Sequence, residues 1–461
     1  MFTSRFLLSA LALAMLAGCV TYQPKELDPA RSQAQFETRS LRDPGLQTFF
    51  ATHGQPAGDE WDLARLTLTA FYFAPELDVA RAQVAEAEGM ANAAEERPNP
   101  SFAFTPGYNK DAIGGVTPWI IGYALNIPVE LRGKRTYRTS GARHKADVAR
   151  FDLARVAWNT RRAVRRALIE LHAAESTAGL WRDQKPLLAQ AAQLVDAQVK
   201  AGDVSPLEAA QARIALNRAE LAARGSERGV ATARSRLAEA IGIPLSALAE
   251  ARLSYRGLAE PAEPVAVGEA RRWAAQNRAD LLAALAEYAA SQSALQLEIA
   301  RQYPDLALGP GYQLDQGEGK WSLGLGVTLP IFDRNRGQIA AAQARREAAA
   351  ARFHSLQNRV IGEVDRAISD FASALGDLDT IKTMRTNIEQ QARTVQAQQT
   401  AGETSRLDLA RAQIELADNA RAELDARVRA EQALGALEDA VQRPLAWPDS
   451  AWRNAPSSAA N

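Results

Sequence analysis

The second half of the chain follows the pattern of the first half, and this internal repeat limits the possible folds to those built from two similar units. Three segments recur: residues 100–108 (PSFAFTPGY) at 304–312 (PDLALGPGY), residues 119–128 (WIIGYALNIP) at 321–330 (WSLGLGVTLP), and residues 201–208 (AGDVSPLE) at 401–408 (AGETSRLD). Pro244, Pro261 and Pro264 would interrupt any helix between the two halves. We therefore predict a first repeat over 61–242, a connector over 243–266 and a second repeat over 267–442.

Each repeat contains a segment in which large apolar residues alternate with small or polar ones, over 119–127 and 321–329. Strict alternation over such a length is typical of a tilted transmembrane β-strand with one apolar face. Phe102, Phe104, Leu306 and Leu308 mark the partner strands, so we predict β-hairpins over 101–130 and 304–332 with loops at 109–118 and 313–320. The residues that we expect to face lipid are Trp119, Ile121, Tyr123 and Leu125 in the first hairpin and Trp321, Leu323, Leu325 and Val327 in the second.

Two unusually long helices are predicted, from about Arg135 to Lys200 and from about Asn335 to Thr400. The first contains a single proline, Pro186, and the second contains none. At ~1.5 Å per residue each helix would extend roughly 100 Å, a length that requires coiled-coil packing. Gly202 and Gly402 end these helices and allow an antiparallel partner to follow. The remaining predicted helices are the partners over about 205–241 and 405–442 and shorter ones over 62–74, 75–96, 267–276 and 278–302.

The N-terminus resembles the export signal of a bacterial lipoprotein. Residues 1–18 have an early arginine and then an apolar stretch that is too short for a permanent membrane anchor. The segment 16–19 (LAGC) resembles a lipobox, which makes Cys19 the expected lipidated N-terminus, and Val20 resembles an outer-membrane sorting residue. An ordinary signal peptide with an incidental cysteine is the alternative. We predict a signal peptide over 1–18, an N-terminal extended segment over 19–60 and a C-terminal tail over 443–461.

The composition excludes several classes of protein. There are 54 Lys and Arg residues against 54 Asp and Glu residues, whereas a nucleic-acid-binding protein needs a basic excess. One cysteine and four scattered histidines (His53, His144, His172 and His354) provide no metal-ligand cluster. No spacing of nucleophile, histidine and acid indicates catalysis. We therefore predict that the chain is not an enzyme and has no cofactor, no catalytic residue and no metal site.

The predicted strands are too few to form a membrane structure alone. Four strands cannot close a barrel, for which about eight are needed, and an open sheet in lipid would leave unsatisfied edges. The barrel must therefore be shared between subunits. The predicted fold class is mainly α with a small membrane β part.

With these elements the chain resembles the TolC-like outer-membrane factor family. The resemblance rests on the twofold order of elements, on residues 99–100 (NP), 127–128 (IP) and 329–337 (LPIFDRNRG), and on the two AGxxSxL-acid segments. It implies a homotrimer with a shared twelve-strand β-barrel and a long antiparallel coiled-coil tunnel in the periplasm. The implied partners are a periplasmic adaptor protein, a proton-driven transporter of the inner membrane and outer-membrane lipid. The LPIFDR turn is most similar to the CzcC-type heavy-metal efflux branch, although this chain lacks a His- or Met-rich region.

The two AGxxSxL-acid segments place Glu208 and Asp408 after Gly202 and Gly402. Serine followed three residues later by an acid predicts a capping box at the start of each partner helix. The resemblance additionally implies that these turns form the periplasmic tip, where acidic residues surround the entrance. In a trimer they would form a negative ring that favours cations.

The sequence therefore predicts the exit channel of a tripartite efflux pump in the bacterial outer membrane, lipid-anchored and extending into the periplasm. Two alternatives stay open at this stage. One is a lipid-anchored coiled-coil envelope protein without conductance, and the other is the exit duct of a type I protein secretion system. The sequence does not distinguish a metal, a drug or a protein as the substrate, nor does it identify the transporter and adaptor.

Overall fold

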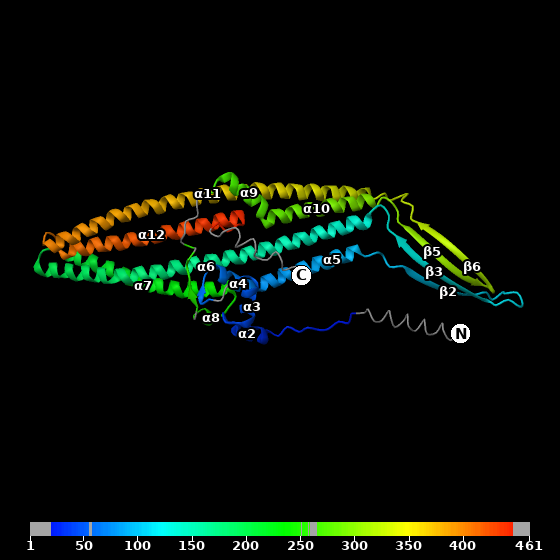
Figure 1. The fold of residues 1–461 in the computed structure, drawn as a ribbon, viewed down its shortest axis with the longest axis horizontal. Coiled ribbons are helices and arrows are strands. Elements are labelled where there is room, and N and C mark those ends of the chain that lie inside the picture. The colour runs from blue at the N-terminus through cyan, green and yellow to red at the C-terminus, as the bar shows by residue number, and fades with distance from the viewer. Residues whose placement is uncertain (1–19, 55–57, 250, 257, 259–264, 446–461) are drawn as a thin grey trace.

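The fold is known from a computed structural model that describes residues 20–54, 58–249, 251–256, 258 and 265–445. The molecule is elongated, with a β-sheet at one end and two helical tips at the other (Figure 1). Two long helices, α6 (Lys134–Ala201) and α11 (Arg336–Ala401), connect these ends. Cys19 and the predicted signal peptide lie outside the described residues.

Each long helix folds back on an antiparallel partner, α7 (Pro206–Ile241) for α6 and α12 (Arg406–Val441) for α11. The chain reverses because Gly202 (φ 84°) and Gly402 (φ 81°) adopt the left-handed conformation, which suits glycine. After Gly202, the backbone N–H of Asp203 donates to the carbonyl oxygen of Gln198 at 2.9 Å and closes the last turn of α6. The predicted helical hairpins are confirmed, and their ends differ from the prediction by only one or two residues.

Four shorter helices are α4 (Leu63–Phe73), α5 (Pro75–Glu95), α9 (Val267–Asn277) and α10 (Ala279–Ala300), all close to their predicted bounds. α5 and α10 run toward the sheet, whereas α4 packs against α6 and α7, and α9 packs against α11 and α12. α10 begins where α12 ends, because the N–H of Ala279 donates to the Gln442 side chain at 2.7 Å and the Arg278 guanidinium donates to the Ala440 carbonyl at 3.2 Å. The two helices therefore lie almost in line in Figure 1.

The sheet contains the strands β2 (Ser101–Tyr108), β3 (Trp119–Val129), β5 (Leu306–Asp315) and β6 (Glu318–Val327), all antiparallel and in that order. The first hairpin has the predicted loop over 109–118. The predicted loop over 313–320 is wrong, since the second hairpin turns tightly at Gln316 and Gly317. Both residues have positive φ (53° and 96°), which matches the twist of two directly connected strands.

The prediction of an extended segment over 19–60 is also wrong for its described part. This part contains α2 (Pro29–Glu37) and α3 (Pro44–Thr52). Each helix begins with an aspartate before a proline, and the carboxylates of Asp28 and Asp43 accept hydrogen bonds from backbone N–H groups of the first turn. Asp-Pro is thus the local signal that starts both helices.

The described part of the connector crosses between the two halves. It includes α8 (Leu245–Ala249) and β4 (Arg252–Leu253), which pairs in parallel with β1 (Glu60–Trp61). These two short strands were not predicted. Beneath them a core of leucine and isoleucine side chains from α4, α6 and α7 is fully buried. A second core joins α9 to α11 and α12. Among the described helices, none has a stretch apolar and long enough to cross a membrane.

Candidate functional site

The register of the sheet brings four aromatic side chains into one row across all four strands. Phe104 pairs with Tyr123, Tyr123 with Tyr312, and Tyr312 with Trp321. Directly paired residues project from the same face of an antiparallel sheet. The rings are in contact within each hairpin, with centroids 5.5 Å apart for Phe104 and Tyr123 and 4.8 Å apart for Tyr312 and Trp321.

The other predicted lipid-facing residues share this face, because alternate positions of β3 and β6 lie on the same side as Tyr123 and Trp321. Some are strongly exposed in the single chain, with Trp321 at 84 % and Leu323 at 77 %. The opposite face carries small or polar residues, such as Gly309 paired with Gly324 and Gln313 paired with Lys320. The sheet is therefore two-faced, with a large apolar surface on one side only.

The sheet is also incomplete at its edges. Within the described chain, β2 and β6 each pair with one neighbour only, so each has a free row of backbone N–H and C=O groups. A sheet that meets lipid needs these groups to be bonded. Further strands from other chains can supply the bonds.

At the far end of the molecule, the tips of the two helical hairpins pack together through a small apolar cluster. It contains Ala191 and Val195 of α6, Ala209 of α7, and Leu407 and Ala410 of α12. Glu208 and Asp408 follow the turns of these hairpins and are therefore at the same end of the molecule (Figure 1). Gly202 and Gly402 form the turns, as predicted.

The two acids differ in their local contacts. Asp408 completes a capping box, in which its N–H donates to the Ser405 hydroxyl at 3.1 Å and its carboxylate accepts from the Ser405 backbone N–H at 3.2 Å. The carboxylate also accepts from the Ser405 hydroxyl at 2.7 Å. The Ser405 hydrogen bond holds the pKa of the Asp408 carboxyl below its usual range. The same prediction for Ser205 and Glu208 is wrong, because Ser205 makes no side-chain cap. Among the described residues, none forms a hydrogen bond or an ion pair with the Glu208 carboxylate, so this carboxylate is hydrated by solvent.

A polar joint ties the two hairpins together between the tips and the middle of the molecule. The Gln184 side chain, which is 2 % exposed, donates to Asp418 at 2.9 Å and accepts from Arg421. The Arg421 guanidinium also pairs with Asp418 and lies 3.9 Å from the centroid of the Trp181 ring. α6 and α12 are thus held together by hydrogen bonds and by a cation–π contact.

A buried ionic layer holds the same two helices nearer the sheet. Arg161 donates to the Glu438 carboxylate at 3.0 Å, and Arg165 lies 3.7 Å from the same group. Arg165 packs directly over Gly435, where a Cβ atom would clash with its guanidinium. Burial lowers the pKa of Arg165. Charged groups lose their hydration when they are buried. Removing one partner of such a pair therefore leaves an uncompensated charge in the core and destabilises the protein.

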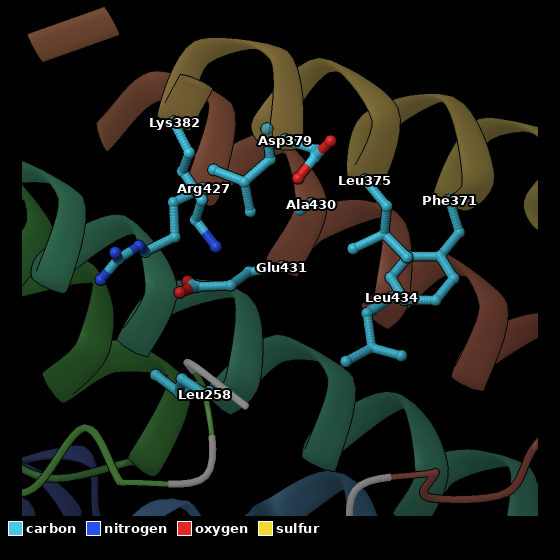
Figure 2. A pocket seen from close by; sticks show the side chains of 10 residues that line it. Leu258, Phe371, Leu375, Asp379, Lys382, Arg427, Ala430, Glu431 and Leu434 are labelled. Atoms are coloured by element: carbon cyan, nitrogen blue, oxygen red, sulfur yellow. The ribbon is translucent and has the colours of Figure 1, made fainter. Parts of the chain in front are cut away.

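Near this layer a cavity of about 300 Å³ opens between α11, α12 and the connector (Figure 2). Glu431 extends between its apolar and its basic wall and is 4 % exposed. Neither of its carboxylate oxygens has a hydrogen-bond partner in the part of the chain that the structure describes. Burial raises the pKa of Glu431 to about 7, although Arg427 and Arg165 oppose the shift. Sequence reasoning missed this residue, because a glutamate in an Ala-rich helix has the pattern of an exposed position. Within the described ranges no group of three or more His, Cys, Asp or Glu side chains is placed to hold a metal ion.

Comparison with known proteins identifies the family of the chain. A family model described as "Outer membrane efflux protein" matches the chain twice, over residues 73–243 and 271–441. The cobalt-zinc-cadmium resistance protein CzcC of Cupriavidus metallidurans is 30 % identical over 238 residues, which are 51 % of this chain and 56 % of CzcC. The chain thus matches little more than half the length of this relative. The nickel-cobalt-cadmium resistance protein NccC of Alcaligenes xylosoxydans xylosoxydans is 27 % identical over 308 residues, 65 % of this chain and 68 % of NccC.

The fold is similar to that of solved outer-membrane channels. The outer-membrane channel OprN superposes with a TM-score of 0.66 at 18 % sequence identity, and the match covers 92 % of this chain and 98 % of OprN. At this identity the likeness establishes the fold: a mainly helical chain with a small antiparallel sheet.

Proposed function

Because the chain belongs to the outer membrane efflux protein family, we propose that it is the exit channel of a tripartite efflux pump. The observation that carries this proposal is the two-faced sheet with two free edges at one end of long helical hairpins. A protein that merely tethers envelope layers has no use for strands with one apolar and one small, polar face. A family of efflux channels also agrees with the prediction that the chain is not an enzyme.

The free edges support a homotrimer. Three copies of a four-stranded sheet would join β6 of one chain to β2 of the next and close a twelve-strand barrel, which leaves no unpaired edge in lipid. The row that includes Tyr123 and Trp321 would then face lipid, and the small residues around Gly309 and Gly324 would face the lumen. The twofold repeat is supported by the two family matches and by the nearly equal lengths of α6 and α11, at 68 and 66 residues.

The long hairpins would continue this barrel as a tunnel in the periplasm. The sheet and the tips lie at opposite ends of the molecule, so a sheet in the outer membrane directs the tips toward the inner membrane (Figure 1). There the tips would meet a periplasmic adaptor and, through it, a proton-driven transporter. A lipid chain on Cys19 would add a second attachment to the outer membrane.

Glu208 and Asp408 would ring the entrance of the tunnel. Three chains bring six carboxylates to one axis, and such a ring attracts cations and repels anions. The uncapped Glu208 is the more available of the two for a cation or an adaptor side chain, since Asp408 is already bonded to Ser405.

Heavy-metal cations are the proposed substrate class. Both named relatives are metal-resistance proteins, and an acidic entrance suits divalent cations. Deleting the gene should increase the sensitivity of the host bacterium to Co²⁺, Zn²⁺ or Cd²⁺, and the wild-type gene should restore resistance. If the deletion increases sensitivity to organic drugs and not to metals, the channel serves a drug efflux pump instead. Loss of a secreted protein with normal metal tolerance would favour a type I secretion duct instead.

A further inference from the structure

The cavity beside Glu431 has the features of a docking site rather than of an empty packing defect. Its apolar wall consists of buried or half-buried side chains: Leu258, Phe371, Leu375, Leu378 and Leu434. Figure 2 shows Phe371, Leu375 and Leu434 together on one side of the opening and Lys382 and Arg427 on the other. A volume of about 300 Å³ is at the lower end of the range for small ligands and has room for one large aromatic side chain.

The mouth of this cavity carries charges of both signs. Asp379 and Lys382 are exposed and lie three residues apart on α11, so both project from nearly the same side of the helix. Among the described residues, neither side chain has an ion pair. Arg427 lines the same opening, but it is already paired with Glu423 at 3.3 Å. An occupant of this site should therefore combine an apolar group with one acid and one base.

Residues 446–461, which follow the described part of the chain, combine these features. The segment contains two tryptophans, Trp447 and Trp452, and its charged side chains are one acid, Asp449, and one base, Arg453. Trp452 stands between the two charges in sequence. The order of apolar and charged groups is thus complementary to the apolar wall with Asp379 and Lys382 at its mouth.

The segment also starts close to the cavity. Leu445, the last described residue, packs against the apolar cluster that contains Phe371, Leu375 and Leu434 of the cavity wall. Leu434 is only two turns from the end of α12, which is about 10 Å along the helix. Seven residues lead from Leu445 to Trp452 and span up to about 23 Å when extended. The cavity is therefore within reach along a continuous apolar surface.

We propose that the cavity between α11, α12 and the connector is the docking site of the C-terminal segment of the same chain, with Trp452 in the cavity, Arg453 at Asp379 and Asp449 at Lys382. The docked segment would lie across both helices of the second hairpin and against Leu258 of the connector. This proposal does not depend on the channel function.

The test is photo-cross-linking in the full chain. Benzoyl-phenylalanine replaces Trp452, which keeps an aromatic side chain, and the cross-linked peptides are identified by mass spectrometry. We expect links within one chain to residues 371–382 or 427–434. The same probe at Ser458 is the control and should give a yield at least several-fold lower. Links only to other regions, links only between chains, or a bound small molecule in the cavity without links to the probe would overturn the proposal.

Charge reversal tests the predicted pairs. Asp379→Lys should reduce the cross-linking yield several-fold, and adding Arg453→Asp to it should restore the yield. Asp377→Lys is the matched control, since Asp377 is exposed on the same helix but does not line the cavity, and it should leave the yield unchanged. Equal effects of Asp379→Lys and Asp377→Lys, or no rescue by Arg453→Asp, would contradict the assigned pairing.

Discussion

Tyr123 of β3 and Tyr312 of β5 lie directly opposite each other, in the pairing that joins the first hairpin to the second. This pairing fixes the register between the two hairpins and places the large side chains of both on one face. A slip by a single residue would put half of them on the face with Gly309 and Gly324. The assignment of lipid-facing residues therefore depends on one contact between segments that are far apart in the sequence.

Arginine at Leu323 tests this assignment. Leu323→Arg should destabilise the assembled channel by ~2–4 kcal/mol if the residue lies near the middle of the membrane, because a charge in lipid loses its hydration. Ser322→Arg is the matched control on the opposite face. It is preferable to Gly324→Arg, since a Cβ at Gly324 would meet the Gly309 carbonyl oxygen at 3.4 Å. Denaturation from lipid vesicles measures both variants, and equal losses would contradict the register.

The lipid anchor is tested at Cys19, which lies outside the described residues. We expect Cys19→Ser to abolish labelling by a radioactive or clickable fatty acid and to leave an unprocessed precursor. The sheet should still allow insertion, so the variant should remain in the membrane fraction. Labelling equal to that of the wild type would show that Cys19 is not the site of lipidation.

Variants of Glu208 and Asp408 at the helical tips distinguish a role in helix capping from a role in ion selectivity. Glu208→Gln should not change stability, because Glu208 contributes no cap, whereas Asp408→Ala should cost about 1 kcal/mol through loss of the capping box. Asp408→Asn removes the charge with a smaller loss of hydrogen bonding. In bilayer recordings, the double variant Glu208→Gln with Asp408→Asn should show weaker cation preference than the wild type. Unchanged ion selectivity would limit both acids to a structural role.

The raised pKa of Glu431 predicts an unusual dependence of the free energy of unfolding on pH. Its pKa is raised to about 7 in the folded protein, so the folded state binds a proton more tightly than the unfolded state. The resulting stabilisation is fully present below the ordinary pKa of a glutamate and is lost as the pH rises through about 7. Glu431→Gln should abolish this contribution and be more stable than the wild type at alkaline pH, by on the order of 2–3 kcal/mol.

The measurement is the unfolding midpoint of both proteins across the range from acidic to alkaline pH. Glu415→Gln on the exposed side of α12 is the control and should keep the wild-type pH profile. Identical profiles for Glu431→Gln and the wild type would show that the buried carboxylate does not titrate in this range.

The helices and hairpins could be predicted because their signals are local. Long stretches with at most one proline define α6 and α11, glycines at 202 and 402 end them, and strict alternation defines β3 and β6. The same local reasoning could have found α2 and α3 from their Asp-Pro starts. It could also have found the tight turn at Gln316 and Gly317, where a glycine interrupts the alternation.

The contacts between elements could not be predicted in this way. The pairing of Tyr123 with Tyr312 and the joint of Gln184, Asp418 and Arg421 depend on how two helical hairpins pack. In sequence, the buried Glu431 and Glu438 do not differ from the exposed glutamates of other Ala-rich helices. The capping boxes illustrate the same limit, since similar sequences formed the box at Ser405 and not at Ser205.

As an exit channel, the assembled protein should conduct ions through the outer membrane. Purified full-length protein should therefore produce stepwise currents in planar lipid bilayers, with a preference for cations, and Leu323→Arg should insert far less often. Circular dichroism of the same preparation in lipid should show the β-signal of the inserted sheet. If the wild-type protein is inserted by this criterion but passes no current at any voltage or pH, it is not an exit channel.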